Sequence, residues 1–408
     1  RELLVMLYET ALDAVDGRYL VNQWCGQNDD HNKKLFTHCV AIGKASAAML
    51  QGALDNFPSL EKSLLICPSS KITRQLKKNK KIISIAASHP IPDESSIEAG
   101  QTLISFLTGL DENDRVLFLI SGGTSSLVEV PVDNISLEKL QQINSYLLAS
   151  GKDIHQINAW RQQFSKIKGG GLLSYIKPAS VTQLLLSDVK GDDVAIIGSG
   201  LLVESTSLPE PDEYLSALNV QSEPGDNKIR ATKSVSSTQV NTFIIGNIKL
   251  AMQAVHEAAQ ADGLASFIHD EFIEGDACLV AERLYNKLKD AEPGIHVMGG
   301  ETTVCLPESP GIGGRNQTLA LAFARLIADE PGLHLLAAGT DGVDGNSTCA
   351  GAVVSKYTSI KASKMGFDIN AEIEKANAGL LLMATDDLVN GDNSNTNVMD
   401  IIIVYKTE

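Results

Sequence analysis

The sequence has 408 residues, of which 43% are hydrophobic and 21% charged, and its formal net charge at pH 7 is −16. This length suffices for two domains with separate cores, and the composition is too apolar for a disordered chain. The acidic balance argues against a general nucleic-acid binder, because such proteins need a surface rich in Lys and Arg. It does not exclude a small anionic substrate, since a few cations in a cleft suffice to bind one.

Cysteines and apolar runs limit the cellular setting. The six cysteines are scattered and form no CxxC pair, which argues against a zinc knuckle or a redox dithiol. A disulfide-built scaffold would be richer in cysteine, so a reducing, cytoplasmic location is predicted. The longest apolar runs, at 116–120 and 379–384, fall far short of the roughly 18 residues that span a bilayer. No signal-peptide pattern is visible, and the sequence begins at Arg1, which leaves open whether a leader has been removed.

The first half of the chain alternates segments that predict helices with segments that predict strands. Apolar residues three or four apart, such as Leu4, Leu7 and Ala11, predict an opening helix. Further helices are predicted after Gly43, after Pro92 and over two stretches between about 136 and 164. Short, continuously apolar runs predict buried strands at 39–43, 63–67, 82–86, 116–120 and 182–187. This alternation predicts a parallel sheet covered by helices on both faces.

A polar segment from 204 to 240, rich in Ser, Thr, Pro and charged residues, is predicted to link two domains. After it, strands are predicted at 243–246, 266–270, 296–300, 303–307 and 334–339. Helices are predicted at 248–262, at 276–290 and from Asn316. We therefore place the domain boundary near 240, which divides the chain into 1–240 and a smaller 241–408.

Several predicted strands end in a loop that combines glycine with a polar or charged residue. These loops are AIGKAS (41–46), SGGTSS (121–126), SDVKGDD (187–193), GGET (299–302) and AGTDGVDG (338–345). Ligands of parallel sheets bind outside the carboxyl ends of the strands, where loops and helix N-termini present backbone N–H groups. The need for a tight turn could explain one such glycine loop, but it does not readily explain five. We therefore predict that the loops form a cleft for an anionic, phosphorylated ligand.

Lys44 and the segment 121–126 are the first candidates for binding that anion. Lys44 follows the turn at Gly43 and precedes a helix, so its ammonium can reach an anion held there; a solvated lysine is the alternative. No GxxxxGK[ST] segment occurs, which excludes a Walker A loop. In 121–126, backbone N–H groups and the Ser and Thr hydroxyls can cradle phosphate oxygens, unless the segment is only a tight turn.

Four charged residues in the other loops are candidates for catalysis or metal binding. Asp188 ends an apolar strand, where a carboxylate holds Mg²⁺, accepts a substrate proton or caps the next segment. Arg315 begins a helix after a glycine-rich turn, where a guanidinium can bind a phosphate or carboxylate. Glu301 follows two glycines, and Asp341 lies in a loop where an Asx-turn is the alternative to metal binding.

Together these segments resemble the glycerate 2-kinase family with a MOFRL-type C-terminal domain. In chain order, the resemblance is carried by AIGKAS, SHPIPDESSIEAG, FLISGGTSSL, SGKDIHQINAW, KIKGGGLL, LLLSDVKGDD, MGGETTV, GGRNQTLALA and AAGTDGVDGNSTCAGA. It extends from about Ala41 to about Asp400. It implies an α/β fold: a Rossmann-like parallel-sheet N-terminal domain and a smaller α/β C-terminal domain, with the active-site cleft between them. It also implies Mg²⁺-dependent transfer of the γ-phosphoryl group of ATP to D-glycerate, which gives 2-phosphoglycerate.

The resemblance implies roles for particular residues. Lys44 and Arg315 match the family's catalytic lysine and arginine and would hold the γ-phosphate. Asp188 would orient the 2-hydroxyl or share in binding Mg²⁺, with Glu301 and Asp341 as further metal or ribose ligands. Substrate or nucleotide phosphates would be bound by Gly43, Ser121, Gly122, Gly123, Thr124, Lys168 and Asn316. The expected partners are small molecules, D-glycerate or a similar hydroxy acid, rather than nucleic acid or membrane, and we expect a monomer or a homodimer.

The chain departs from the family's usual segments at four places. KGGR is replaced at 168–171 by KGGG, SGP at 199–201 by SGL, GNN at 246–248 by GNI, and GPTGTNV at 391–398 by GDNSNTNV. These changes motivate one alternative, a catalytically weak protein that binds a phosphorylated metabolite. A second alternative, hydroxypyruvate reductase, needs a GxGxxG segment after a strand, and the sequence contains none.

Overall fold

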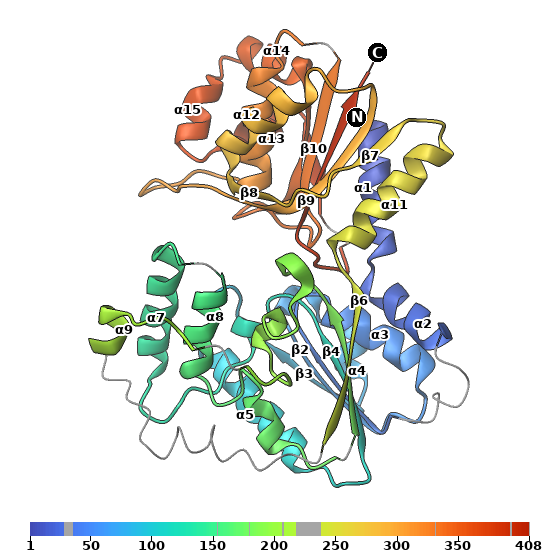
Figure 1. Cartoon of the computed structure of the whole chain (residues 1–408), viewed down its shortest axis with the longest axis vertical. Helices are drawn as coiled ribbons and strands as arrows, with labels where there is room; N and C mark the ends of the chain where they lie inside the picture. The colour runs from blue at the N-terminus through green and yellow to red at the C-terminus, as the bar shows by residue number, and fades with distance from the viewer. Residues whose placement is uncertain are drawn as a thin grey trace. The chain divides into compact units, whose positions relative to one another are not determined.

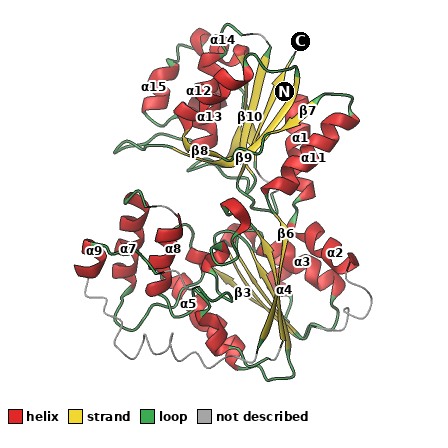
Figure 2. Ribbon diagram, in the orientation of Figure 1, coloured by secondary structure: helices red, strands yellow, loops and turns green. Residues whose placement is uncertain are grey.

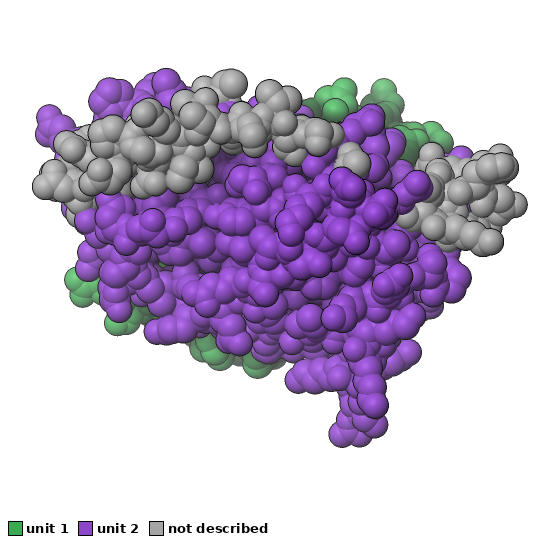
Figure 3. Space-filling model, turned by 90° about the horizontal axis from the view of Figure 1, so that it is seen from below, with its two compact units in different colours: residues 1–16, 246–408 green, residues 17–245 purple. Residues whose placement is uncertain are grey.

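The chain folds into two compact units, coloured separately in Figure 3. Unit 1 consists of residues 1–16 and 246–408, and unit 2 of residues 17–245. The computed structural model describes residues 1–27, 36–152, 154–178, 180–205, 208–217, 238–330, 332–391 and 394–407. Most of the predicted linker, at 206–207 and 218–237, therefore lies outside the described residues.

These units differ from the predicted division at 240 in two places. Helix α1 (Glu2–Ala14) belongs to unit 1, where it packs on α11 (Ile248–Ala261). Its Tyr8 hydroxyl donates a hydrogen bond to the carbonyl oxygen of Gly339, at 2.7 Å. Strand β6 (Gln239–Gly246) instead completes the sheet of unit 2. An apolar stripe shows that a helix is buried, but not against which sheet.

Unit 2 is built on a sheet with the strand order β3-β2-β1-β4-β5-β6. Its other strands are β1 (His38–Ile42), β2 (Lys62–Cys67), β3 (Ile82–Ala86), β4 (Arg115–Ile120) and β5 (Ser180–Leu186). These strands confirm the predicted runs, and the pairs among them are parallel. The order is that of Rossmann-like folds, and it reverses between β1 and β4, where such sheets bind ligands.

Helices cover both faces of this sheet, with α2 and α3 on one side and α5 on the other (Figure 1). Helix α5 begins after Pro92 as predicted, because the Asp93 carboxylate accepts the N–H of Ser95 at 2.9 Å and caps the first turn. The helices of this unit are α2 (Gly17–Gln27), α3 (Ser46–Asn56), α4 (Arg74–Lys78), α5 (Glu94–Thr108), α6 (Thr124–Leu127), α7 (Leu137–Ala149), α8 (Ile154–Gln163) and α9 (Glu213–Ala217).

Unit 1 contains a mixed sheet with the order β12-β11-β10-β13-β9-β7, in which β8 also pairs with β9. Its strands are β7 (Ser266–Ile268), β8 (Ile273–Asp276), β9 (Gly294–Thr303), β10 (Leu333–Gly339), β11 (Cys349–Ser355), β12 (Leu388–Asn390) and β13 (Asp400–Lys406). Strands β7 and β8 are parallel to β9, whereas the other pairs are antiparallel. The two strands predicted at 296–300 and 303–307 are a single strand, β9, which ends at Thr303.

Two layers of helices enclose the mixed sheet (Figure 2). Helices α1 and α11 pack on one face, and the other face is covered by α13, whose residues 316–324 are all buried. The helices that surround α13 (Arg315–Leu326) are α12 (Ala277–Leu288), α14 (Lys356–Lys364), α15 (Ile369–Glu374) and α16 (Ala378–Ala384). Because α13 is buried over residues 316–324, the backbone of Arg315 at its first position is held in place.

Two further observations bear on the expected cellular setting. All six cysteines are free thiols, in agreement with the prediction that the fold is not built on disulfides. Over the described ranges, no helix combines the length and the apolar character that crossing a membrane requires.

Candidate functional site

In unit 2, the loops after β1 and β4 meet at the point where the strand order reverses. The backbone N–H of Lys44 donates to the carbonyl oxygen of Gly122, at 2.9 Å. The next N–H, of Ala45, donates to Oγ of Ser121, at 3.0 Å. Two segments far apart in the sequence are therefore joined directly beside the ends of adjacent parallel strands.

Two glycines make this close approach possible. Gly43 has a φ of +126°, and a Cβ there would lie 2.2 Å from Oγ of Ser121 and 2.6 Å from its carbonyl oxygen. Gly123 has a φ of +84°, and its Cβ would lie 3.3 Å from Cγ of Lys44 and 3.0 Å from Cδ2 of His89. The Lys44 side chain thus passes over Gly123.

The hydroxyls predicted to cradle phosphate are engaged inside the protein. Thr124 Oγ1 donates to the carbonyl oxygens of Ser121 (2.7 Å) and Ile42 (3.1 Å). Ser125 Oγ bonds to Ser199 Oγ at 2.6 Å, and Ser126 Oγ donates to Gly123 at 3.1 Å. The backbone is different: within the described residues, no acceptor is found for the N–H groups of Gly122, Gly123 and Thr124.

Asp188 lies at the same edge of the sheet, just after the neighbouring strand β5. It follows β5 by two residues and is half-buried, and β5 pairs with β4. The carboxyl ends of β1, β4 and β5 therefore carry Lys44, the glycine pair and Asp188 in neighbouring positions of one sheet. A lysine, several backbone donors and a carboxylate along one edge are suited to binding an anion next to a proton acceptor.

Lys168, predicted to contact phosphate, is placed differently. Its side chain is 2% exposed, and its ammonium forms a buried ion pair with Glu129. Burial lowers the pKa of Lys168 against the opposing effect of Glu129. The adjoining turn is tight, since a Cβ on Gly171 would lie 2.2 Å from the carbonyl oxygen of Lys166. Lys168 therefore compensates an internal carboxylate, and the chain has no room for the family's arginine at position 171 in this conformation.

In unit 1, Arg315 is the centre of an ion-pair cluster at the start of α13. Its Nε and Nη2 donate to the two carboxylate oxygens of Asp400, at 2.6 and 3.0 Å. Its Nη1 lies 2.6 Å from a carboxylate oxygen of Glu301. Burial acts to lower the pKa of the guanidinium, but Asp400, Glu301 and Asp344 outweigh it and raise the pKa. The guanidinium is fixed in place yet remains 36% exposed.

Asp344, which was not among the predicted site residues, organises the same helix start. Its carboxylate accepts the backbone N–H groups of Asn316 (3.1 Å) and Gln317 (2.8 Å). Burial raises the pKa of Asp344 to about 7, although these hydrogen bonds act to lower it. Asn316, a residue predicted to bind phosphate, is buried, and its backbone N–H is already bonded to Asp344. The Asp-Gly pair at 344–345 indicates a turn, but nothing in the local sequence indicates that the Asp344 carboxylate caps a distant helix.

The three predicted metal ligands are divided between the two units. Glu301 pairs with Arg315, and the Asp341 carboxylate accepts the N–H of Val343 at 3.1 Å, which is the Asx-turn alternative. Asp188 belongs to unit 2, whereas Glu301 and Asp341 belong to unit 1. Over the part of the chain that the structure describes, no group of three His, Cys, Asp or Glu residues is arranged to hold a metal ion.

Comparison with known proteins covers both units. Residues 3–232 match a domain of unknown function, DUF4147, and residues 294–400 match the MOFRL family. A glycerate 2-kinase of Pyrococcus horikoshii is 31% identical over 98% of this chain and 93% of its own length. A putative hydroxypyruvate reductase of Agrobacterium vitis is 34% identical over 89% of this chain and 98% of its own. The crystal structure of a glycerate kinase from Thermotoga maritima superposes with a TM-score of 0.83 at 29% identity, covering 100% of this chain and 99% of that one.

Proposed function

The chain belongs to the glycerate 2-kinase family, and on that premise we propose that it transfers the γ-phosphoryl group of ATP to D-glycerate and forms 2-phosphoglycerate. The observation that supports this best is the junction of the loops after β1 and β4. There Lys44 passes over a glycine beside backbone N–H groups at the switch point of a parallel sheet. Such a junction binds anions through preorganised dipoles and one mobile charge.

Phosphoryl transfer needs little covalent chemistry from a protein, because the main tasks are positioning and neutralising charge on the transferred group. In this proposal, Lys44 and the N–H groups of Gly122, Gly123 and Thr124 bind phosphate or carboxylate oxygens. Asp188 accepts a hydrogen bond from the glycerate hydroxyl and orients its oxygen for attack. Each of these groups lies at the carboxyl edge of the unit 2 sheet.

Arg315 would neutralise charge on the transferred group. A guanidinium has five N–H donors, and Asp400 and Glu301 are contacted through three different nitrogens of Arg315. The nitrogens Nη1 and Nη2 each carry a second N–H, which is suited to a phosphate oxygen. Since the carboxylates already hold the guanidinium, little side-chain entropy would be lost when the phosphate binds.

Magnesium would enter with the nucleotide and neutralise charge on its phosphates. Mg²⁺ in kinase sites takes one or two protein carboxylates together with phosphate oxygens and water, rather than an all-protein cage. The half-buried carboxylate of Asp188 at a strand end fits that requirement. Glu301 is a less suitable ligand, because it already compensates Arg315.

The described departures from the family at Leu201 and Ser394 are accommodated inside the fold, so they do not argue against a kinase. Leu201 is 1% exposed. Ser394 is buried and donates a hydrogen bond to the carbonyl oxygen of Thr340. The N–H of Val398 donates to Oγ1 of Thr340, at 2.8 Å. Residues 392–393 lie outside the described part.

The test is to incubate the protein with Mg·ATP and D-glycerate and to measure pyruvate formed by enolase and pyruvate kinase, with and without phosphoglycerate mutase. Pyruvate without the mutase identifies 2-phosphoglycerate and supports the proposal; pyruvate only with the mutase identifies 3-phosphoglycerate and overturns the regiochemistry. The Lys44→Met variant should lose the signal. No pyruvate in either reaction contradicts the proposal, and oxidation of NADH by hydroxypyruvate would favour the reductase.

A further inference from the structure

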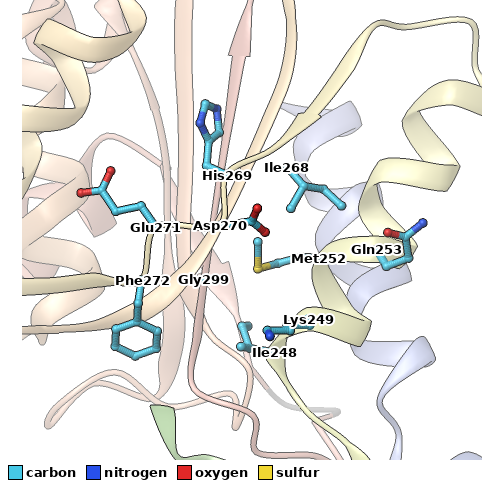
Figure 4. Close-up of a pocket in the computed structure, with 10 residues that line it drawn as sticks. All are labelled: Ile248, Lys249, Met252, Gln253, Ile268, His269, Asp270, Glu271, Phe272 and Gly299. Carbon is cyan, nitrogen blue, oxygen red and sulfur yellow. The ribbon is translucent and has the colours of Figure 1, made fainter. Parts of the chain in front are cut away.

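A pocket of about 260 Å³ opens on unit 1 (Figure 4). It lies between the first turns of α11, the loop that follows β7 and Gly299 of β9. Its volume is near the lower end of the range for small-molecule sites. Among its lining residues, Gly299 belongs to the loop 299–302, which the sequence predicted as part of a ligand cleft.

The floor of the pocket is apolar. Ile248 and Met252 of α11 are 7% and 6% exposed, and Ile268 at the end of β7 is half-buried opposite them. Gly299 permits this packing, because a Cβ there would lie 2.4 Å from Cγ1 of Ile248 and 3.0 Å from Sδ of Met252. Ile248 stands where the family usually has asparagine, so the apolar floor is a property of this chain.

The rim carries both signs of charge. Asp270 and Lys249 are exposed on the loop after β7 and on α11, respectively. Glu271 points away from Met252 and Asp270 in Figure 4, and its carboxylate bonds to Lys287 at 3.0 Å. Asp270 is therefore the rim carboxylate that a ligand would meet, with an ammonium opposite it.

His269 forms part of the pocket wall, but its ring points away from Met252 and Asp270 in Figure 4, and its hydrogen bonds define its protonation. His296 Nε2 lies 3.0 Å from the carbonyl oxygen of Glu292, which only accepts, so this nitrogen carries the proton. His296 Nδ1 is then an acceptor, and His269 Nε2 donates to it at 3.1 Å. His269 Nδ1 is left as an acceptor. Burial lowers the pKa of both rings, which keeps them neutral.

These groups suit a ligand with a flat apolar part, hydroxyl or amino donors and a negative charge. D-glycerate lacks an apolar part and would leave the floor unused. A nucleoside phosphate has all three: a base for the Met252 and Ile268 floor, ribose hydroxyls for Asp270 and a phosphate for Lys249. Acidic side chains after parallel strands bind ribose in the same way in dinucleotide folds.

The position along β9 supports the same ligand. Gly299 lines the pocket, and Glu301, two residues further on, holds Arg315. Two strand residues span about 7 Å. We propose that this pocket binds the adenosine part of ATP, an inference that rests on the proposed kinase function for the identity of the nucleotide.

Two variants of the full chain test the proposal. Met252→Trp fills the floor, and Asp270→Asn removes the charge of the ribose acceptor and replaces one of its two oxygens with an NH₂ donor, at an exposed position where folding is not at stake. Each should raise the KM for ATP by about tenfold, the effect of losing one good interaction, and leave kcat and the KM for D-glycerate unchanged. Asp262→Asn, an exposed acid at the other end of α11, is the matched control and should change nothing.

Calorimetric titration with adenosine, without Mg²⁺ or glycerate, separates this proposal from the kinase function. Adenosine binding that is lost in Met252→Trp supports the pocket even if no glycerate turnover is found. An active kinase whose KM for ATP is unchanged in both variants, with no adenosine binding to the wild type, overturns the pocket and leaves the kinase function intact.

Discussion

In unit 2, the candidate groups lie on loops at the carboxyl ends of parallel strands, and most of them are backbone N–H groups fixed by glycine. In unit 1, the candidate group is one arginine held by carboxylates at the start of a buried helix. The first arrangement depends on backbone conformation at Gly43 and Gly123, and the second on charge pairing across a mixed sheet. Substitutions should therefore disturb unit 2 through sterics and unit 1 through electrostatics.

The largest effect is expected from removing the charge of unit 1. Arg315→Ala should lower kcat by about 10³-fold or more, the scale of an arginine that stabilises the transferred phosphoryl group. Steady-state kinetics with Mg·ATP and D-glycerate measure it. The matched control is Arg325→Ala, in the last turn of the same helix, whose ion pair with Glu282 is 3.8 Å long and partly exposed. Near-normal turnover of Arg315→Ala would contradict the role.

A smaller effect is expected when the arginine stays but loses its support. Asp400→Asn removes the charge that two Arg315 nitrogens contact, so the guanidinium can move. We expect kcat to fall by about tenfold, as for the loss of one charge-assisted hydrogen bond, with the KM for glycerate nearly unchanged. The control is Glu282→Gln, which breaks the exposed pair of Arg325. An equal fall in both variants would refute a specific positioning role for Asp400.

Sterics in unit 2 are tested by a single methyl group. Gly43→Ala combines a positive φ with contacts of 2.2 and 2.6 Å to Ser121, and should cost about 3 kcal/mol of unfolding free energy. Gly151→Ala, also at positive φ but with nothing within 4 Å, should cost about 1–2 kcal/mol. Urea unfolding followed by tryptophan fluorescence compares them, since both tryptophans, Trp24 and Trp160, lie in unit 2. Equal losses of unfolding free energy in the two variants would contradict tight packing of the loops around Gly43 and Ser121.

The last expected effect is a pH dependence of stability in unit 1. The pKa of Asp344 rises from 3.8 to about 7 on folding, so between these values the unfolded chain has already lost a proton that the folded chain retains. This group therefore makes stability fall as pH rises from about 4 to 7, by at most about 1.4 kcal/mol per pH unit. Urea unfolding followed by circular dichroism should show a shallower decline for Asp344→Asn than for the wild type. Identical slopes would contradict a neutral Asp344.

Local sequence determined much of this protein. Continuous apolar runs specified the strands of unit 2, because a strand buried on both faces cannot carry polar residues at alternate positions. Asp93 specified the start of α5, because its carboxylate satisfies N–H groups within the first turn. Glycine next to polar residues at strand ends predicted a ligand cleft at these loops, and the structure joins two of them at Gly43 and Gly123.

Tertiary structure alone decided the rest, because it depends on partners distant in sequence. The apolar stripe of α1 looks the same whether the helix packs on the next strands in the chain or on strands more than 300 residues later. The Tyr8–Gly339 hydrogen bond shows that the distant strands are its partner. Lys168 was indistinguishable from a ligand-binding lysine until Glu129 was found beside it. Asp344 caps a helix 28 positions earlier, and Asp400 holds an arginine 85 positions earlier. A charged side chain in a loop shows that it needs a partner, and only the folded chain determines which one.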